Sequence, residues 1–222
     1  MTLRTYSLLG PPGSGKSTQA ELLKKKFNLY HVDIGSELRA VAEQDTEIGR
    51  TIDEIIHHKR ELVPDALMDE VFRQAIARVP QEKGILFDGA PRYVSQIPEL
   101  ENILKGHQRT IDKIIFIDLS EEEAIARISK RYLCFACRRP FILGKDITLE
   151  DTSCSFCGGR VGQRKDDTKE GIQKRFSVFR EETYPVIEHF EKLGKLIRVH
   201  GDQSPEAIFQ DIVDHISNEE SL

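Results

Sequence analysis

The sequence predicts an α/β fold, a doubly wound parallel sheet with helices on both faces. Short apolar runs that are typical of buried strands alternate along the chain with segments of helical apolar period. A glycine-rich loop lies between the first predicted strand and the first predicted helix. Because alternating strands and helices are joined by crossover connections, the helices cover both faces of the sheet. Ligands of such sheets bind beyond the carboxyl ends of the strands, so we expect the functional site there.

The predicted strands are short apolar runs bounded by glycine or charged residues. The run Ile-Leu-Phe between Gly84 and Asp88 and the run Ile-Ile-Phe-Ile after Lys113 have the continuous apolar character of strands that are buried on both faces. The segments that we predict as strands are 4–9, 29–34, 84–88, 113–119 and 195–200.

Helices are predicted between these strands, where apolar residues recur at helical spacing. Ala20, Leu23 and Phe27 recur in this way in the first helix, and Pro64 lies near the start of another, where proline is tolerated. A long helix is expected after the capping sequence Asp167-Thr-Lys-Glu, ending near residue 193. The other predicted helices are 16–27, 36–44, 46–59, 64–79, 95–105, 121–131 and 205–217.

The composition is that of an ordinary globular protein, and it disfavours several function classes. The 222 residues can bury a sizeable core, and 39% of them are hydrophobic. A formal net charge of −5 does not favour nucleic acid or a membrane surface as a partner. The longest uninterrupted apolar run is 114–117, whereas a transmembrane helix needs about 20 apolar residues. We therefore expect a cytoplasmic protein, since the apolar stretch at the N-terminus is also too short for a secretory signal.

All four cysteines lie in residues 132–165, which lack a helical period and are predicted to form an inserted small domain. Cys134 and Cys137 form one CxxC pair, Cys154 and Cys157 form another, and 16 residues separate the pairs. This spacing is typical of a four-thiolate Zn²⁺ site. Four thiolates complete a tetrahedron, so the metal would be structural and would supply folding energy to a segment with little core. The alternative is two disulfides or free buried cysteines, which a reducing compartment disfavours.

The glycine-rich loop has the sequence Gly10-Pro-Pro-Gly-Ser-Gly-Lys-Ser-Thr and matches the Walker A pattern. Its glycines allow backbone N–H groups to turn toward phosphates, and the following helix N-terminus adds partial positive charge. Lys16 adds a full positive charge, and Ser17 offers a hydroxyl to Mg²⁺. The strand–loop–helix context favours a P-loop for a nucleoside triphosphate over a simple turn that caps a helix. The candidate ligands are Gly10, Gly13, Ser14, Gly15, Lys16, Ser17 and Thr18.

Arginines near strand ends are candidate catalytic residues, because phosphoryl transfer depends on positioning and positive charge more than on an acid or base. Arg92 follows the strand 84–88, and Arg127 and Arg131 are four residues apart on one face of a predicted helix. Asp88 ends the same strand, where P-loop enzymes carry a carboxylate that is linked to Mg²⁺, although a turn cap is the alternative. Further candidates are Arg39, Arg164 and Arg175, each of which alone would be typical of a solvated surface.

Taken together, these motifs resemble those of adenylate kinases of the long-lid, zinc-containing type, from residue 8 to about residue 217. The matching segments are 10–18, 33–39, 61–63, 88–92 with Gln96, Arg127 with Arg131, and 164–167 with Arg175. The resemblance implies a nucleoside monophosphate kinase that transfers a phosphoryl group directly from MgATP to AMP, forming two ADP. It also implies a monomer whose partners are ATP and AMP, with Mg²⁺ bound to ATP and structural Zn²⁺ in the lid.

The resemblance implies three parts as well: a core P-loop domain formed by residues 1–32, 63–130 and 168–222, an NMP-binding flap at 33–62, and a zinc-binding lid at 131–167. Closure of the lid would exclude water, which would otherwise accept the phosphoryl group. Arg127 and the loop that contains Gln203 would border the ATP base. The implied catalytic residues are Lys16, Asp88, Arg92, Arg131, Arg164 and Arg175. The implied AMP-binding residues are Ile34, Gly35, Arg39, Glu61, Leu62, Val63, Gly89, Arg92 and Gln96.

The chain departs from the family pattern at Ile34, Ala90 and Ile142, where adenylate kinases usually carry Thr, Phe and His. Ser17 stands in place of the usual Gly, which suits Mg²⁺. Ile34 cannot form a hydrogen bond with a base and Ala90 removes an aromatic wall, although a larger and a smaller side chain can compensate for each other. CMP, UMP or GMP are therefore alternative acceptors, whereas the amide of Gln96 favours adenine. A P-loop ATPase that presents a zinc ribbon to a partner is a further alternative, which the acidic net charge disfavours.

Overall fold

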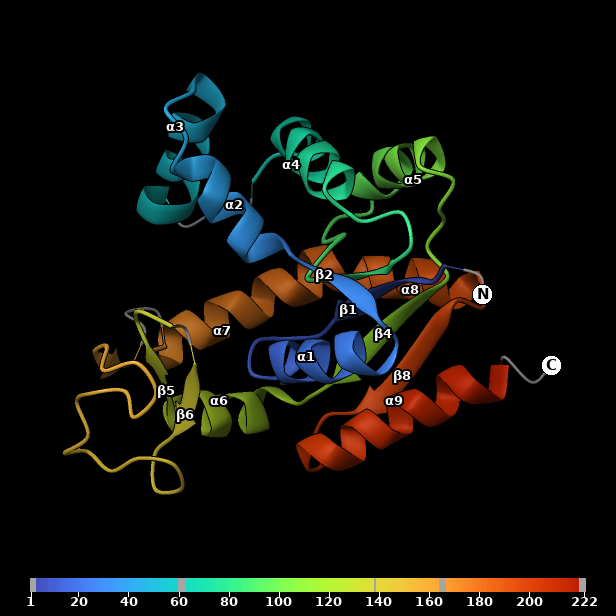
Figure 1. Ribbon diagram of the computed structural model, residues 1–222. Helices are drawn as coiled ribbons and strands as arrows, with labels where there is room; N and C mark the ends of the chain where they lie inside the picture. The colour runs from blue at the N-terminus through green and yellow to red at the C-terminus, as the bar shows by residue number, and fades with distance from the viewer. Residues whose placement is uncertain (1–2, 60–62, 138, 164–166, 220–222) are drawn as a thin grey trace.

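Five parallel strands form the central sheet of the computed structural model, which describes residues 3–59, 63–137, 139–163 and 167–219 (Figure 1). The strands are β1 (Thr5–Leu9), β2 (Leu29–Asp33), β3 (Gly84–Asp88), β4 (Lys113–Asp118) and β8 (Leu196–His200). Their order is β2-β3-β1-β4-β8, and each neighbouring pair is parallel. Strands β2 and β3 lie on one side of β1, and β4 and β8 lie on the other. The carboxyl end of β1 therefore marks a topological switch point, where such sheets bind ligands.

Successive strand residues pack on opposite faces of the sheet, as the pleat requires. Phe87 and Phe116 belong to the apolar cluster with α4 (Asp65–Ala77), α5 (Gln96–Gly106) and α8 (Tyr184–Lys192). Leu86 and Ile115 belong to the cluster with α1 (Lys16–Lys26) and α9 (Pro205–Glu219). Figure 1 shows α4 and α5 on one side of the sheet, and α1 and α9 on the other. This arrangement confirms the predicted α/β fold with helices on both faces.

Three helical segments lie between β2 and α4. They are α2 (Ile34–Ala42), α3 (Glu47–Asp53) and a π-helical segment, η1 (Glu54–Lys59). Helix α2 begins at Ile34, two residues before the predicted start, because the side chain of Asp33 at the end of β2 accepts a hydrogen bond from the backbone N–H of Ser36. Figure 1 shows α2 and α3 extending away from the sheet beyond β2.

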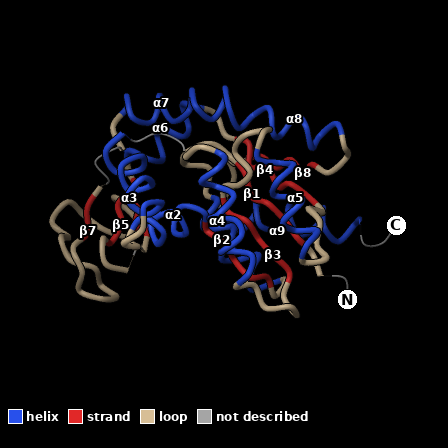
Figure 2. Tube along the Cα trace, turned by 90° about the horizontal axis from the view of Figure 1, so that it is seen from above, coloured by secondary structure: helices blue, strands red, loops and turns tan. Residues whose placement is uncertain are grey.

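The segment that carries the cysteines forms a separate antiparallel sheet, which Figure 2 shows apart from the central sheet. Its strands are β5 (Arg131–Cys134), β6 (Pro140–Ile142) and β7 (Val161–Gly162), in the order β6-β5-β7. The preceding helix α6 (Glu121–Ser129) ends two residues before the predicted end. Arg131 pairs with Ile142 in the sheet instead of continuing the helix. The prediction that Arg127 and Arg131 share one helix face is therefore wrong, since only Arg127 is helical.

The long helical stretch after this segment consists of α7 (Lys169–Val178), the π-helical segment η2 (Phe179–Thr183) and α8. Thr168 is the N-cap of α7, and its hydroxyl accepts a hydrogen bond from the backbone N–H of Gly171 at 3.0 Å. Gly194 follows α8 with a φ of 67°, the left-handed conformation that commonly ends helices. In the part of the chain that the structure describes, no helix is long and apolar enough to cross a membrane.

Candidate functional site

The glycine-rich loop between β1 and α1 curls around the ammonium group of Lys16. Gly13 and Gly15 have φ values of 80° and 87°, a left-handed conformation that glycine adopts without strain. The Lys16 Nζ donates hydrogen bonds to the carbonyl oxygens of Gly10 at 2.8 Å and Pro11 at 3.0 Å. The loop thus places the ammonium group and the N-terminus of α1 at the carboxyl end of β1. This is the arrangement by which helix N-termini bind phosphate groups.

Several charged side chains act on Lys16 from distant parts of the sequence. Desolvation by the surrounding protein lowers the pKa of Lys16 to about 8, and the carboxylate of Asp88 opposes this shift. The positive charges of Arg92, Arg131 and Arg175 lower the pKa further. Cations from the segment after β3, from β5 and from α7 thus act electrostatically on the loop lysine.

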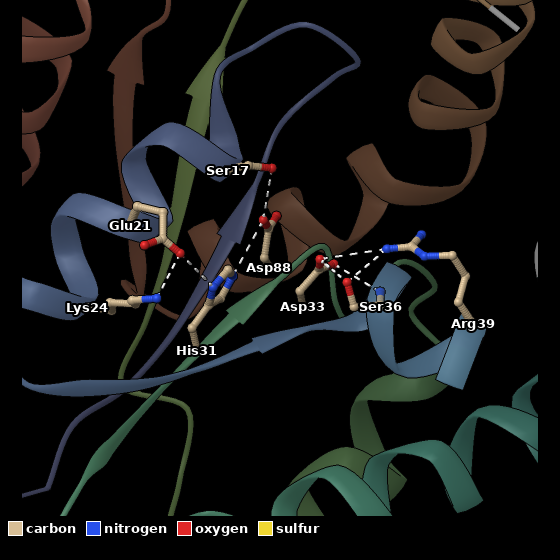
Figure 3. Close-up of polar contacts among 8 residues, drawn as sticks. All are labelled: Ser17, Glu21, Lys24, His31, Asp33, Ser36, Arg39 and Asp88. Carbon is tan, nitrogen blue, oxygen red and sulfur yellow. Dashed lines mark hydrogen bonds and ion pairs between the residues drawn. The ribbon is translucent and has the colours of Figure 1, made fainter. Parts of the chain in front are cut away.

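Asp88 lies at the end of β3, next to β1, and only 8% of it is exposed. The Ser17 hydroxyl donates a hydrogen bond of 3.4 Å to Asp88 Oδ2, as Figure 3 shows. A hydroxyl and a carboxylate beside a phosphate loop are the hard oxygen donors that Mg²⁺ prefers. The donor set of Ser17 and Asp88 therefore fits Mg²⁺.

Arg92 and Gln96 are held together in the segment that follows β3. Arg92 Nε donates to the carbonyl oxygen of Gly89 at 2.9 Å, and a Cβ atom at Gly89 would lie 3.1 Å from the Arg92 guanidinium. Gly89 also has a φ of 84°, so two requirements favour glycine there. The backbone N–H of Arg92 donates to Gln96 Oε1 at 2.9 Å, which fixes the orientation of the Gln96 amide.

Arg39 on α2 faces the end of β2. Its Nη2 donates a hydrogen bond of 2.8 Å to the Ser36 hydroxyl and lies 3.9 Å from Asp33 Oδ2, as Figure 3 shows. Gly35 permits this approach, because a Cβ atom there would lie 3.3 Å from both Arg39 Nη1 and Asp33 Oδ1. The predicted site residues Ile34 and Val63 are buried in the main apolar cluster, as is Ala90. Glu61 and Leu62 lie outside the described residues.

Arg131 and Arg175 converge on the carboxylate of Asp167, which is fully buried. Arg131 Nη2 lies 2.7 Å from Asp167 Oδ1 and 2.9 Å from Oδ2, and Arg175 Nη2 lies 2.9 Å from Oδ1. The first arginine comes from β5 and the second from α7, so the carboxylate joins the small sheet to the helix. Arg164, the remaining predicted catalytic arginine, lies outside the described residues.

The two residues predicted to border the ATP base lie on different elements. Arg127 is on α6, where its Nε donates to Glu123 Oε1 at 2.8 Å. Helix α6 lies against the phosphate loop, since a Cβ atom at Gly13 would lie 3.1 Å from the Ile128 side chain. Gln203 follows β8, and its amide nitrogen donates to Asp211 Oδ2 at 2.8 Å. Helix α6, which carries Arg127, is thus packed against the phosphate loop, while the amide of Gln203 is engaged by α9.

The four cysteines form a cluster in which all Sγ atoms lie within 4.8 Å of one another. The Sγ atoms of Cys134 and Cys157 are 3.5 Å apart, and those of Cys137 and Cys154 are 3.8 Å apart. A tetrahedral zinc site with Zn–S bonds of about 2.3 Å places its sulfur atoms about 3.8 Å apart, whereas a disulfide needs about 2.05 Å. All four are free cysteines, so the sulfur cluster fits Zn²⁺ and excludes the disulfide alternative.

Sequence reasoning assigned no role to three side chains at this site: Asp167, Asp33 and His31. Asp167 was predicted to be part of a helix cap and of the motif segment 164–167, and Asp33 was only part of the motif segment 33–39. His31 Nε2 lies 3.6 Å from Asp88 Oδ2, and its Nδ1 lies 3.7 Å from Glu21 Oε1. One signal was available, because His31 and Asp33 are two residues apart near the carboxyl end of a predicted strand and so share one face.

Comparisons with known proteins agree with this geometry. The family model described as adenylate kinase matches residues 8–195. A protein of Thermosipho africanus named adenylate kinase is 35% identical over 94% of this chain and 97% of its own length. Proteins of the same name from Archaeoglobus fulgidus and Listeria monocytogenes are 34% and 33% identical, each over 92% of this chain, covering 94% and 95% of their own lengths.

The matched region contains the phosphate loop, the arginines around Lys16 and the cysteine cluster. This chain and the three relatives align over nearly their full lengths. The resemblance to adenylate kinases that the sequence motifs indicate is therefore confirmed. The chain belongs to the adenylate kinase family of phosphotransferases.

Proposed function

We propose that the protein catalyses the reversible transfer of the γ-phosphoryl group of MgATP to AMP, forming two ADP. An oxygen of the AMP phosphate forms the new bond to the γ-phosphorus while the bond to the β–γ bridging oxygen breaks. The electron pair of the broken bond remains on the ADP that leaves. No covalent enzyme intermediate is needed, because the two nucleotides react directly.

The observation that carries this proposal is the phosphate loop that holds Lys16, together with the Asp167 carboxylate that brings Arg131 and Arg175 to one place. The charges of Arg92, Arg131 and Arg175 also lower the pKa of Lys16. These cations would stabilise the negative charge on the oxygens of the transferring group. Arg164 is proposed to join them. Mg²⁺, bound to the ATP phosphates near Ser17 and Asp88, would supply further positive charge.

The roles proposed for the remaining residues are those that the resemblance to the family implies. The loop residues 10–18 would hold the ATP phosphates, and Arg127 would lie against the ATP base together with the loop that contains Gln203. Gly35, Arg39, Gly89 and Arg92 would hold the AMP phosphate. Ile34, Gln96 and residues 61–63 would contact its base.

We propose that residues 33–62 act as the NMP-binding flap and residues 131–167 as the lid, with the rest of the chain as the core domain. Figure 1 shows α2 and α3 at the upper left, beyond β2, and the small β5–β6 sheet at the lower left, apart from the central sheet, which supports this division. Closure of the lid would exclude water from the reacting phosphates. Structural Zn²⁺ would hold the lid together. A monomeric, cytoplasmic enzyme remains a prediction from the sequence.

CMP, UMP and GMP remain alternatives to AMP as the phosphoryl acceptor. Ile34 and Ala90 are both buried in one apolar cluster and offer no polar side-chain atom to a base, so Gln96 is left as the main polar determinant. An assay of ADP formation with MgATP and each of AMP, CMP, UMP and GMP tests the proposal. We expect the highest kcat/KM with AMP. A higher kcat/KM with another nucleotide would reassign the acceptor, and equal ATP hydrolysis with and without acceptors would indicate an ATPase.

A further inference from the structure

Asp33 places a carboxylate beside Arg39, which the proposed function assigns to the acceptor phosphate. It ends β2 at the carboxyl edge of the sheet, where it pairs in register with Asp88 of β3. Its Oδ2 accepts a hydrogen bond of 2.6 Å from the Ser36 hydroxyl, and Ser36 in turn accepts one of 2.8 Å from Arg39 Nη2. Figure 3 shows the three side chains in this order. Asp33 is thus coupled to Arg39 both through Ser36 and directly at 3.9 Å.

Arg92, the second arginine that the proposed function assigns to the acceptor phosphate, also experiences the charge of Asp33. Desolvation by the protein lowers the pKa of Arg92, and the carboxylates of Asp88 and Asp33 oppose this shift. Asp33 is therefore close enough to act on the Arg92 guanidinium. An acceptor phosphate held by both arginines would lie near a side chain of its own charge.

The Asp33 carboxylate has two opposite effects on phosphate binding: it positions Arg39, and it repels the phosphate. As a hydrogen-bond acceptor it positions Arg39, but Arg39 and Asp33 are 42% and 43% exposed, and exposed ion pairs at this distance contribute little. As a negative charge it repels a phosphate group that carries one to two negative charges of its own near neutral pH. Solvent screens both effects, but the phosphate carries up to twice the charge of the Arg39 guanidinium, so we take the repulsion as the larger effect.

We infer that Asp33 sets the acceptor affinity of the site: it holds Arg39 while the acceptor is absent and weakens the binding of the nucleoside monophosphate dianion. This inference rests on the proposed function. It concerns a residue that acts through charge on the ligand and through Arg39, so it predicts a change in KM for the acceptor more than a change in kcat.

The variant Asp33→Asn tests the inference, because asparagine caps a helix as well as aspartate does but carries no charge. We expect the KM for AMP and the dissociation constant of AMP alone to fall about fivefold, with little change in the KM for ATP. The difference from the parent protein should shrink at about 0.5 M KCl, since salt screens exposed charges. Asp33→Ser, which also caps, should change the KM for AMP in the same direction.

Asp45→Asn is the matched control. Asp45 lies in the same flap segment, pairs with Arg50 and is 98% exposed, so its removal deletes one negative charge away from the acceptor residues. The inference is overturned when Asp33→Asn leaves the KM for AMP unchanged or raises it while the parent enzyme is active. A parent protein that forms no ADP from MgATP and AMP would instead refute the proposed function.

Discussion

Arg131 and Asp167 form a bidentate ion pair that spans 36 residues of sequence, with Nη2 2.7 Å from one carboxylate oxygen and Nε 3.3 Å from the other. Asp167 also accepts from Arg175, so one buried carboxylate orients two of the proposed catalytic cations. Asp167→Asn removes the negative charge that these two guanidinium groups share. We expect kcat to fall by about tenfold or more and the melting temperature to fall by several degrees.

The control for this variant is Asp151→Asn in the same segment, because its carboxylate accepts hydrogen bonds from Thr148 and pairs with no arginine within the described residues. Steady-state kinetics with MgATP and AMP, together with thermal denaturation, measure both effects. A kcat of Asp167→Asn within twofold of the parent value would contradict the positioning role.

Lys16→Met and Arg92→Ala should each lower kcat/KM by on the order of 10³-fold, as expected for single cations that stabilise a transferring phosphoryl group. Lys25→Met, an exposed change on the same helix as Lys16, provides the control. Activity within tenfold of the parent enzyme in a coupled ADP assay would argue against these roles.

The lowered pKa of Lys16 predicts a pH dependence of ATP binding. In the nucleotide-free protein the ammonium group loses its proton near pH 8, where an ordinary lysine with a pKa of 10.5 remains charged. The charged form is present below this pH and is lost above it, so the dissociation constant of MgATP should rise between pH 7.5 and 9.5. Lys16→Arg should bind more weakly but show a flatter profile, since arginine stays protonated. Calorimetric titration across this range checks the prediction, and a flat parent profile would refute it.

Cys154→Ser should remove a buried sulfur from the zinc cluster and lower the melting temperature, with a smaller effect on the chemical step. The parent protein, purified under reducing conditions, should contain about one equivalent of zinc. Ser153→Ala, a change at the neighbouring position, should leave the metal content unchanged. Less than half an equivalent of zinc in the parent protein would count against a zinc site.

The strands of the central sheet and the helices that cover it were predictable, because the spacing of apolar residues and the positions of glycines are local properties of the sequence. The end of α6 was not, because Arg131 leaves the helix only through its pairing with Ile142, which lies eleven positions further along the chain. The π-helical segments Glu54–Lys59 and Phe179–Thr183 likewise have no local signal that distinguishes them from an α-helix.

The phosphate loop and the cysteine cluster were predictable because the spacing of their residues along the sequence is itself the motif. Asp167 was not recognised as an arginine partner, since its two partners come from a strand and a helix that only the fold brings together. Asp33 and His31 were missed for the same reason: their charged neighbours lie on α2, on α1 and at the end of β3.

The small apolar cluster around the cysteines consists of Cys134, Phe141, Ile147, Cys154 and Val161 among the described residues, with Tyr132 packed against it. Cys134 and Cys154 are also candidate zinc ligands, so the apolar core of this segment and its candidate metal site share residues. If this segment is the zinc-binding lid that we propose, a chelator would unfold the lid while the five-stranded sheet survives. Such a protein would still hold ATP but would expose it to solvent, and a transferase would become a slow hydrolase.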